Sequence, residues 1–450
     1  MFRESLIDKT LHSIKKLIPK SVFNFFAPYY HAGLAHLGSI LYGNPSRSMK
    51  VIGVTGTKGK STTVYLISKI FESAGMPIAA IGSLGFKIKE KEWPNTLKMT
   101  MPGRFKLQKF FYEAKMAGCK YVVLEVTSEG IKQKRHLGIN FDCAVFTNLH
   151  KEHIESHGSF ENYYKAKQEL FARTSNIHVL NADDKNVELF SKFSSKQTIF
   201  YGIEKGDLKA GNLDLKPDGA SFEVYGTKFD INFGGKFNVL NCLAALSVAA
   251  MYRIDLPRIK PVLESIKNIP GRMEFLQKEP FEIVVDYAHT PESLEQVYQT
   301  LKFEILNSKS EINSKFKIQN SKHRLICVLG AAGGGRDKWK RPEFGRIAGE
   351  YCDEIILTDE DPYDENPLSI LKEIERGFSQ ILNSKSKILN HEKILDRKEA
   401  IKIALTKAKQ GDTVIITGKG SEISMAVADG KKIPWSDREI VRELLKQGGQ

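Results

Sequence analysis

The sequence lacks any apolar run long enough to cross a bilayer, and it has only five cysteines in 450 residues. Residues 1–20 are a lysine-bearing amphipathic stretch, without the long apolar block and small-residue cleavage site of a signal peptide. The cysteines are odd in number, form no CxxC pair and lie mostly in apolar runs. We therefore expect buried, reduced thiols and a cytoplasmic protein, and we disfavour a zinc ribbon. The cysteines are Cys119, Cys143, Cys242, Cys327 and Cys352.

Length and charge narrow the class further. A chain of 450 residues is too long for one ordinary core and suits two or three domains. The hydrophobic content of 41% and charged content of 27% are typical of a globular protein. The net charge of +14 would suit nucleic acid, anionic lipid or an anionic metabolite. Because no segment interleaves aromatic with basic residues, nucleic-acid binding is disfavoured.

The character of the chain changes at Lys50. Before it, the aromatic cluster Phe23–Tyr30 is expected to pack on the main body, with a membrane interface as the alternative. After it, short apolar strands alternate with helices, which indicates a mainly parallel α/β sheet. We expect a separate N-terminal segment (1–49), a central parallel-sheet α/β domain (50–269) and a second α/β domain (270–450). Residues 303–322, rich in Lys, Ser and Asn, are interpreted as a surface insertion.

A glycine-rich turn lies between the expected strand 51–55 and the helix that follows. There, backbone N–H groups and the helix N-terminus can hold phosphate. Lys60 would reach the β- and γ-phosphates, and the Ser61 hydroxyl would contact Mg²⁺. Val54 stands where the strict motif has Gly, so the loop is a variant, and a turn without a ligand is the alternative. The loop consists of Gly56, Thr57, Lys58, Gly59, Lys60, Ser61 and Thr62.

Two further features predict a metal or phosphate site. Glu125 ends the expected strand 121–126, where a carboxylate near the phosphate loop could bind Mg²⁺; a surface glutamate is the alternative. The segment 146–158 concentrates histidines and acids, among them Glu152 and His153. A chance cluster in a loop would look the same.

Lys167 lies on the apolar face of an expected helix that Ser159 can cap. It follows Tyr163 by four residues and precedes Leu170 by three, so it points inward with them. An unpaired ammonium inside a protein costs several kcal/mol. The side chain therefore extends to solvent, pairs with an acid or is chemically modified, and a carbamate would turn it into a Mg²⁺ ligand.

The order of these motifs resembles the Mur ligases, and most closely the ligases that add an amino acid to UDP-N-acetylmuramoyl dipeptides. The loop alone also resembles folylpolyglutamate synthetases. The resemblance covers roughly residues 50–440. It implies a reduced N-terminal segment (1–49), a central P-loop-type ATP-binding domain (50–269) and a Rossmann-like α/β C-terminal domain (270–450). The strings that carry it are Leu124-Glu125-Val126-Thr127-Ser128, Gln133-Lys134-Arg135, Asn148-Leu149, His153, His157-Gly158 and Tyr164-Lys165-Ala166-Lys167.

The resemblance implies roles for residues in the first half of the chain. Lys167 matches a carbamylated lysine that, with Ser61, Glu125 and His153, binds Mg²⁺. A second set matches residues near the muramoyl-peptide: Thr100, Thr127, Ser128, Gln133 and Arg135.

In the second half, 237–241 resembles an adenine-proximal element with Asn241, and 271–274 resembles a hinge whose Arg272 reaches the γ-phosphate. Asp286 begins a ribose-binding string. The resemblance places the incoming amino acid at Arg336, Asp361, Gly418 and Glu422.

Four positions depart from the family pattern. Glu152 stands where Asp is usual, Glu129 and Ser421 where His is usual, and Tyr363 where diaminopimelate-adding members have Arg. Since acids surround Tyr363, we favour lysine as the added amino acid, with diaminopimelate left open.

We expect an ATP- and Mg²⁺-dependent ligase that adds the third residue to UDP-N-acetylmuramoyl-L-alanyl-D-glutamate through an acyl phosphate. Its partners would be that nucleotide and a free amino acid, and we expect a monomer. The alternatives are a folylpolyglutamate-type or other amino-acid ligase, and a non-catalytic nucleotide-binding scaffold.

Overall fold

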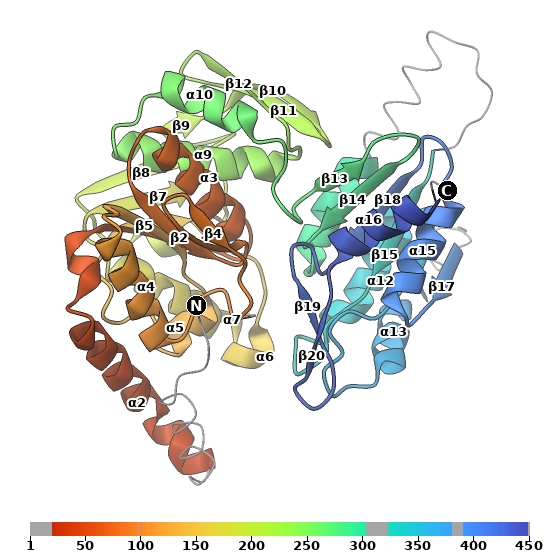
Figure 1. The fold of residues 1–450 in the computed structure, drawn as a ribbon. Coiled ribbons are helices and arrows are strands. Elements are labelled where there is room, and N and C mark those ends of the chain that lie inside the picture. The colour runs from red at the N-terminus through yellow and green to blue at the C-terminus, as the bar shows by residue number, and fades with distance from the viewer. Residues whose placement is uncertain (1–19, 98, 303–322, 380–389, 449–450) are drawn as a thin grey trace. The chain divides into compact units, whose positions relative to one another are not determined.

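The computed structural model describes residues 20–97, 99–302, 323–379 and 390–448 (Figure 1). The chain divides into two compact units. The first contains the described residues up to Leu149, with Glu161–Lys209 and Leu240–Val262, and the second contains His150–Phe160, Ala210–Val239 and the chain from Leu263 onward. The expected amphipathic stretch before Lys20 and the expected insertion 303–322 lie outside the described residues.

A nine-stranded sheet in the order β4-β3-β2-β5-β1-β6-β7-β8-β9 forms the centre of the first unit. It is parallel except at β3 and β4. The alternation seen in the sequence is thus confirmed as an α/β fold, and the carboxyl ends of β1, β5 and β6 lie side by side. The strands are β1 (Lys50–Thr55), β2 (Ile78–Gly82), β3 (Gly85–Ile88), β4 (Lys91–Trp93), β5 (Tyr121–Glu125), β6 (Phe141–Phe146), β7 (Ile177–Asn181), β8 (Gln197–Gly202) and β9 (Leu208–Lys209).

The helices of the first unit follow the apolar periodicity of the sequence. In α3, for example, Val64, Leu66, Ile67, Ile70 and Phe71 are buried. Two of the boundaries between the units fall within helices, one within α9 and one within α10. The helices are α2 (Lys20–Leu41), the 3-10 turn η1 (Pro45–Ser48), α3 (Lys60–Ser73), α4 (Arg104–Met116), α5 (Ser128–Lys132), α7 (Phe160–Ala172), α8 (Glu188–Ser191), α9 (Lys236–Met251) and α10 (Leu256–Ser265).

The second unit contains a six-stranded sheet in the order β13-β14-β18-β15-β16-β17, parallel except at β13. Alternate residues of β15 enter two different cores: Leu325, Cys327 and Leu329 one, Ile326 and Val328 the other. Both faces of this strand are therefore covered. The strands are β13 (Glu274–Gln277), β14 (Glu282–Asp286), β15 (Leu325–Leu329), β16 (Glu354–Leu357), β17 (Asn390–Lys393) and β18 (Thr413–Thr417).

Smaller elements complete the second unit. Two antiparallel sheets are formed by β10 (Gly211–Lys216), β11 (Gly219–Val224) and β12 (Thr227–Ile231), and by β19 (Ser424–Ala426) and β20 (Lys432–Pro434). The helices are α6 (Ile154–His157), α12 (Lys340–Tyr351), α13 (Pro367–Glu375), α15 (Arg397–Lys407) and α16 (Asp437–Gly448).

The expectation of reduced cysteines was wrong for one pair. Cys327 of β15 and Cys352, which follows α12, form a disulfide with a Cα–Cα distance of 6.1 Å. Both side chains enter the same core, so the fold brings together two residues that are 25 positions apart in the sequence. The other three cysteines are free and buried, as expected.

The aromatic cluster before residue 31 was also expected to pack on the body, and this was wrong for three of its members. Phe26 is 57% exposed, Tyr29 is 75% exposed and Tyr30 is 37% exposed. Further along the chain, α2 contacts α4 near Gly38, and Ala35 and Ser39 are buried beside Gly138. In the part of the chain that the structure describes, no helix is long and apolar enough to span a membrane.

Candidate active site

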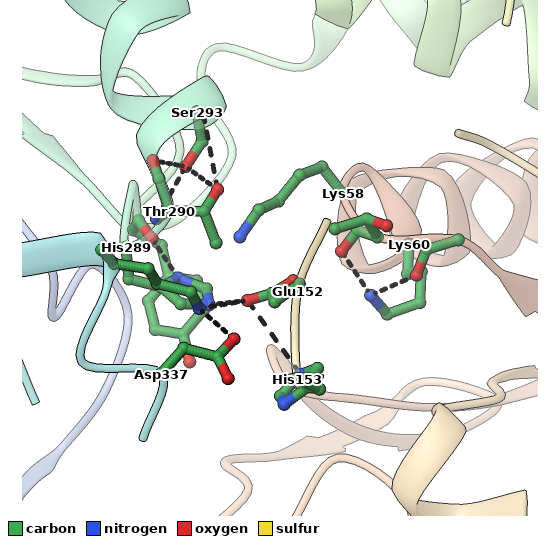
Figure 2. Close-up of polar contacts among 12 residues, drawn as sticks. Lys58, Lys60, Glu152, His153, His289, Thr290, Ser293 and Asp337 are labelled. Atoms are coloured by element: carbon green, nitrogen blue, oxygen red, sulfur yellow. Dashed lines mark hydrogen bonds and ion pairs between the residues drawn. The ribbon is translucent and has the colours of Figure 1, made fainter. Parts of the chain in front are cut away.

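The glycine-rich loop lies between β1 and α3, as the sequence predicted. Gly56 has a φ of 150°, and Gly59, with a φ of 82°, caps α3. The Lys60 ammonium turns back and donates to the carbonyls of Gly56 (2.9 Å) and Thr57 (2.8 Å), as Figure 2 shows. The helix N-terminus and the adjacent lysine make this loop a suitable place for phosphate.

Neighbouring strand ends hold the loop in shape. The Asn148 side chain accepts from the Lys58 N–H at 2.8 Å, and the Thr147 hydroxyl donates to the Lys58 carbonyl at 2.6 Å. A Cβ on Gly56 would lie 1.9 Å from the Thr147 hydroxyl oxygen, and one on Gly59 would lie 2.3 Å from the Asn241 side-chain oxygen. Asn241, predicted from a distant part of the sequence, therefore lies directly against the loop.

Glu125 is buried at the end of β5, with 1% of its surface exposed. One of its oxygens accepts from the Ser83 backbone N–H (2.6 Å) and the Ser83 hydroxyl (2.9 Å). The Ser83 hydroxyl in turn lies 2.5 Å from that of Ser61. Ser83 thus connects two predicted metal ligands that are 64 positions apart in the sequence (125 − 61).

Lys167 is 2% exposed, so the explanation that its side chain extends to solvent is excluded. Its ammonium donates to the Gly56 carbonyl at 2.7 Å and lies 4.6 Å from the centre of the Tyr163 ring. The Tyr163 hydroxyl lies 3.0 Å from that of Thr57. Helix α7 therefore places Lys167 under the phosphate loop.

The residues predicted to lie near the muramoyl-peptide come together around α5. Thr127 caps this helix by accepting from the Gly130 N–H at 3.0 Å, and Ser128 is buried at its first position. The Gln133 side-chain oxygen accepts from Arg135 at 2.7 Å. Arg135 also donates to the carbonyl of Met101, so the segment with Thr100 lies beside α5.

Sequence reasoning missed two residues of the first unit. Ser83 follows β2 at the strand end next to β5, and only the parallel pairing of these strands places it at the site. Arg104, at the start of α4, donates to the Gln133 carbonyl. The only sequence signal for Arg104 was its closeness to the expected substrate element at Thr100.

In the second unit, the loop before α6 brings the buried acid Glu152 together with partly exposed basic side chains, and part of this cluster appears in Figure 2. Glu152 is 3% exposed, and its carboxylate lies 3.6 Å from His289, 3.4 Å from Lys340 and 4.0 Å from His153. His153 itself has a left-handed φ of 55°. Glu152 is thus the centre of the cluster, although the sequence suggested only a substitution for Asp.

The predicted hinge is tied to the end of β14. The Asp286 carboxylate accepts from the backbone N–H groups of Met273 (2.7 Å) and Ala288 (2.6 Å). Arg272 stacks on Tyr287, with 4.4 Å between the guanidinium carbon and the ring centre. Asp286 therefore fixes the backbone beside Arg272, a task beyond the ribose contact that the sequence suggested.

Two of the residues predicted to bind the amino acid, Asp361 and Glu422, pair with one buried cation. Lys419, whose side chain is fully buried, donates to Asp361 (2.9 Å) and Glu422 (2.5 Å). The hydroxyl of Tyr287 donates to Glu422 at 3.2 Å. Gly418 must be glycine because its φ is 105° and a Cβ would lie 2.3 Å from Glu360. Arg336 is an exposed residue whose side chain hydrogen-bonds to Tyr363.

Glu360 is a buried acid beside these residues, and burial raises its pKa to about 7 against the opposing effect of Arg397 and Lys419. The predicted metal ligands are divided between the units: Ser61, Glu125 and Lys167 belong to the first, and His153 to the second. Across the ranges that the structure describes, no group of three or more His, Cys, Asp or Glu side chains is arranged to hold a metal. Oxygen donors, namely the Glu125 carboxylate and Ser61 hydroxyl, are nevertheless the type that Mg²⁺ takes.

A parallel sheet with a phosphate loop after its central strand defines a nucleotide-binding α/β protein. Comparison with protein families matches the Mur ligase middle domain at residues 54–249 and the Mur ligase glutamate ligase domain at residues 271–420. Two relatives are UDP-N-acetylmuramoyl-L-alanyl-D-glutamate–2,6-diaminopimelate ligases. The one from Clostridium acetobutylicum is 36% identical, covering 92% of this chain and 82% of the relative. The one from Geobacillus thermodenitrificans is 34% identical, covering 93% and 83%.

Solved structures agree. A ligase with the same diaminopimelate name superposes with a TM-score of 0.58 at 29% identity, over 89% of this chain and 79% of the other. Mycobacterium tuberculosis folylpolyglutamate synthase has a TM-score of 0.64 but 16% identity, covering 86% and 92%, so it shares the fold alone. The chain belongs to the Mur ligase family. The resemblance to the ligases that add the third residue is confirmed, and the chain is an ATP-dependent, amide-bond-forming enzyme.

Proposed function

We propose that this enzyme adds meso-diaminopimelate, as the third residue, to UDP-N-acetylmuramoyl-L-alanyl-D-glutamate in peptidoglycan precursor synthesis. The observation that carries the proposal is the sequence relationship to diaminopimelate ligases over 92% of the chain. Support comes from a phosphate loop whose surroundings contain Glu125, Ser61 and Lys167. We further propose that residues 50–269 bind ATP, that residues 270–450 bind the amino acid, and that the enzyme acts as a monomer.

Two of the acids that favoured lysine as substrate, Asp361 and Glu365, are already paired within the protein. Lys419 lies 2.9 Å from Asp361, and Glu365 lies 3.0 Å from Arg341. A substrate ammonium would therefore meet acids whose charge is compensated. Arg336, in contrast, carries a guanidinium that is suited to a carboxylate, which diaminopimelate has at both ends and lysine does not.

The reaction proceeds in two steps. A substrate carboxylate attacks the γ-phosphate of ATP to form an acyl phosphate and release ADP. The amine of the incoming amino acid then attacks the acyl carbon, loses a proton and displaces phosphate to form the amide. Lys60 would position the phosphates, and Arg272 would stabilise charge on the transferring group. Glu125 and Ser61 would hold Mg²⁺, which neutralises phosphate charge when bound.

Carbamylation of Lys167 is part of the proposal. A carbamate keeps one N–H, so the hydrogen bond to the Gly56 carbonyl can persist while the ammonium is replaced by an anion that suits Mg²⁺. Protein incubated with ¹³C-bicarbonate should show a carbamate carbon signal that is missing from Lys167→Ala. Full activity of Lys167→Ala would contradict this role.

The test of the function is phosphate release from MgATP with the muramoyl dipeptide and either meso-diaminopimelate or lysine. Release that requires the dipeptide nucleotide and occurs faster with diaminopimelate supports the proposal. Faster release with lysine would instead support lysine as the added amino acid, as the sequence suggested. Release without any amino acid would contradict ligase activity.

A further inference from the structure

Two arginines hydrogen-bond to Gln133. Arg104, at the start of α4, donates to the Gln133 backbone carbonyl. Arg135 donates to the Gln133 side-chain oxygen at 2.7 Å and to the Met101 carbonyl. The start of α4 and the turn after α5 thus bring two guanidinium groups to one glutamine.

Neither guanidinium has a carboxylate ion-pair partner in the described ranges, and the Nε atom of each is buried without a hydrogen-bond acceptor. Burial and the neighbouring Arg135 together lower the pKa of Arg104 to about 10. Burial also lowers the pKa of Arg135, although Glu129 opposes this. Two like charges held together in partial burial are unfavourable unless an anion joins them.

The surroundings of this pair indicate which ligand would supply the anion. Both arginines are partly exposed, so solvent can reach them. Arg135 donates to the carbonyl of Met101, the residue after Thr100. Arg135 also lies in the turn that follows α5, the helix that Thr127 caps. Thr100 and Thr127 are residues predicted to contact the muramoyl-peptide.

We propose that Arg104, together with Arg135, binds an anionic group of the acyl-donor nucleotide. This rests on the proposed function, because the nucleotide in question is UDP-N-acetylmuramoyl-L-alanyl-D-glutamate. The group is either the carboxylate of glutamate that does not react or the diphosphate of the nucleotide, since a guanidinium suits both. Arg104 is therefore a substrate-binding residue of this chain.

Steady-state kinetics of Arg104→Gln test the proposal. The KM for the muramoyl dipeptide nucleotide should rise at least about tenfold, equivalent to about 1.4 kcal/mol, while kcat and the KM for ATP stay within about threefold. Arg104→Lys should recover part of the loss because it keeps a positive charge. Lys109→Met, which removes an exposed lysine of the same helix, should leave all three constants unchanged.

Two substrate analogues distinguish the sources of the anion. In the first, the non-reacting carboxylate of glutamate is an amide. If the carboxylate is the ligand, the wild type discriminates against this amide and Arg104→Gln does not. The second analogue is the muramoyl dipeptide without its nucleotide. If the diphosphate is the ligand, Arg104→Gln no longer raises the KM for this analogue. An equal penalty on all three substrates, or none on any, would overturn the proposal.

Calorimetry without ATP and amino acid separates this proposal from the proposed function. Wild-type protein that binds the dipeptide nucleotide but never turns it over would contradict the ligase assignment. The role of Arg104 could then still be tested by comparing the affinities of wild type and Arg104→Gln for this nucleotide. Equal affinities of wild type and Arg104→Gln would overturn the role of Arg104 whatever the activity. Wild type that does not bind the nucleotide would overturn both.

Discussion

Replacing Asp437 by Asn should strongly destabilise the second unit. Arg397 and Asp437, at the starts of α15 and α16, form a two-pronged ion pair with both donor–acceptor distances at 2.8 Å and both side chains fully buried. The substitution keeps the shape of the side chain but removes the charge of the carboxylate that is paired with the buried guanidinium. Breaking a buried pair in this way costs about 3–5 kcal/mol.

The same two helices provide a matched control. Lys398 and Glu443 are also 2.8 Å apart, but their side chains are 45% and 48% exposed. Because solvent screens an exposed pair, Glu443→Gln should cost less than about 1 kcal/mol. Because the two ion pairs have the same distance and join the same two helices, the comparison measures the effect of burial on the stability of an ion pair.

Urea unfolding measures both variants in a background where Trp93 and Trp339 are replaced by Phe. The remaining Trp435 reports locally, because its indole N–H donates to Asp437 at 2.8 Å. With a slope of about 2 kcal/mol per molar urea, the Asp437→Asn midpoint should fall by about 2 M. If both variants unfold with the same slope, an Asp437→Asn midpoint within about 0.5 M of the Glu443→Gln midpoint would refute the reasoning.

Three other predictions concern the sites. Since Glu360 keeps its proton to about pH 7 in the fold but ionises near 4.5 in the unfolded chain, stability should fall as pH rises between these values, by up to about 3 kcal/mol. Glu360→Gln should abolish that slope in urea titrations, and an unchanged slope would disprove the assignment. Gly56→Ala would force a Cβ onto Thr147 and should lower ATP-dependent phosphate release at least about 100-fold, whereas Gly226→Ala, whose Cβ meets nothing within 4 Å, should leave it unchanged. Equal losses of phosphate release in Gly56→Ala and Gly226→Ala would show that the clash with Thr147 is not the cause. Glu152→Gln removes the buried carboxylate that faces Lys340 and His289 and should reduce kcat/KM about 10-fold or more, with substantial recovery in Glu152→Asp; wild-type kinetics in Glu152→Gln would contradict its central place.

Local patterns in the sequence were enough to predict much of the fold and several site residues. A strand of buried residues, a glycine-rich turn and an apolar helix placed the phosphate loop between β1 and α3. Helical periodicity placed Lys167 on the buried face of α7, and its 2% exposure confirms this. Both features depend on spacing along the chain, which a single sequence reveals.

Other contacts depend on which strands become neighbours. Ser83 reaches Glu125 because β2 pairs with β5, although β3, β4 and α4 intervene in the sequence. Likewise, Cys327 and Cys352 meet because they enter one core. No local pattern encodes such a pairing, so the predictions for these residues were missing or wrong.

The sequence by itself determined the class of protein, because periodicity, glycine placement and motif order are properties of the linear chain. Tertiary structure decided how the charges are compensated. Lys419 pairs with Asp361, one of the acids that had suggested a lysine substrate, while Arg104 and Arg135 are brought together without a carboxylate ion-pair partner in the described residues. The physical reason is that the effect of a charge depends on its distance to other charges and on its burial, and both are set only when the chain folds.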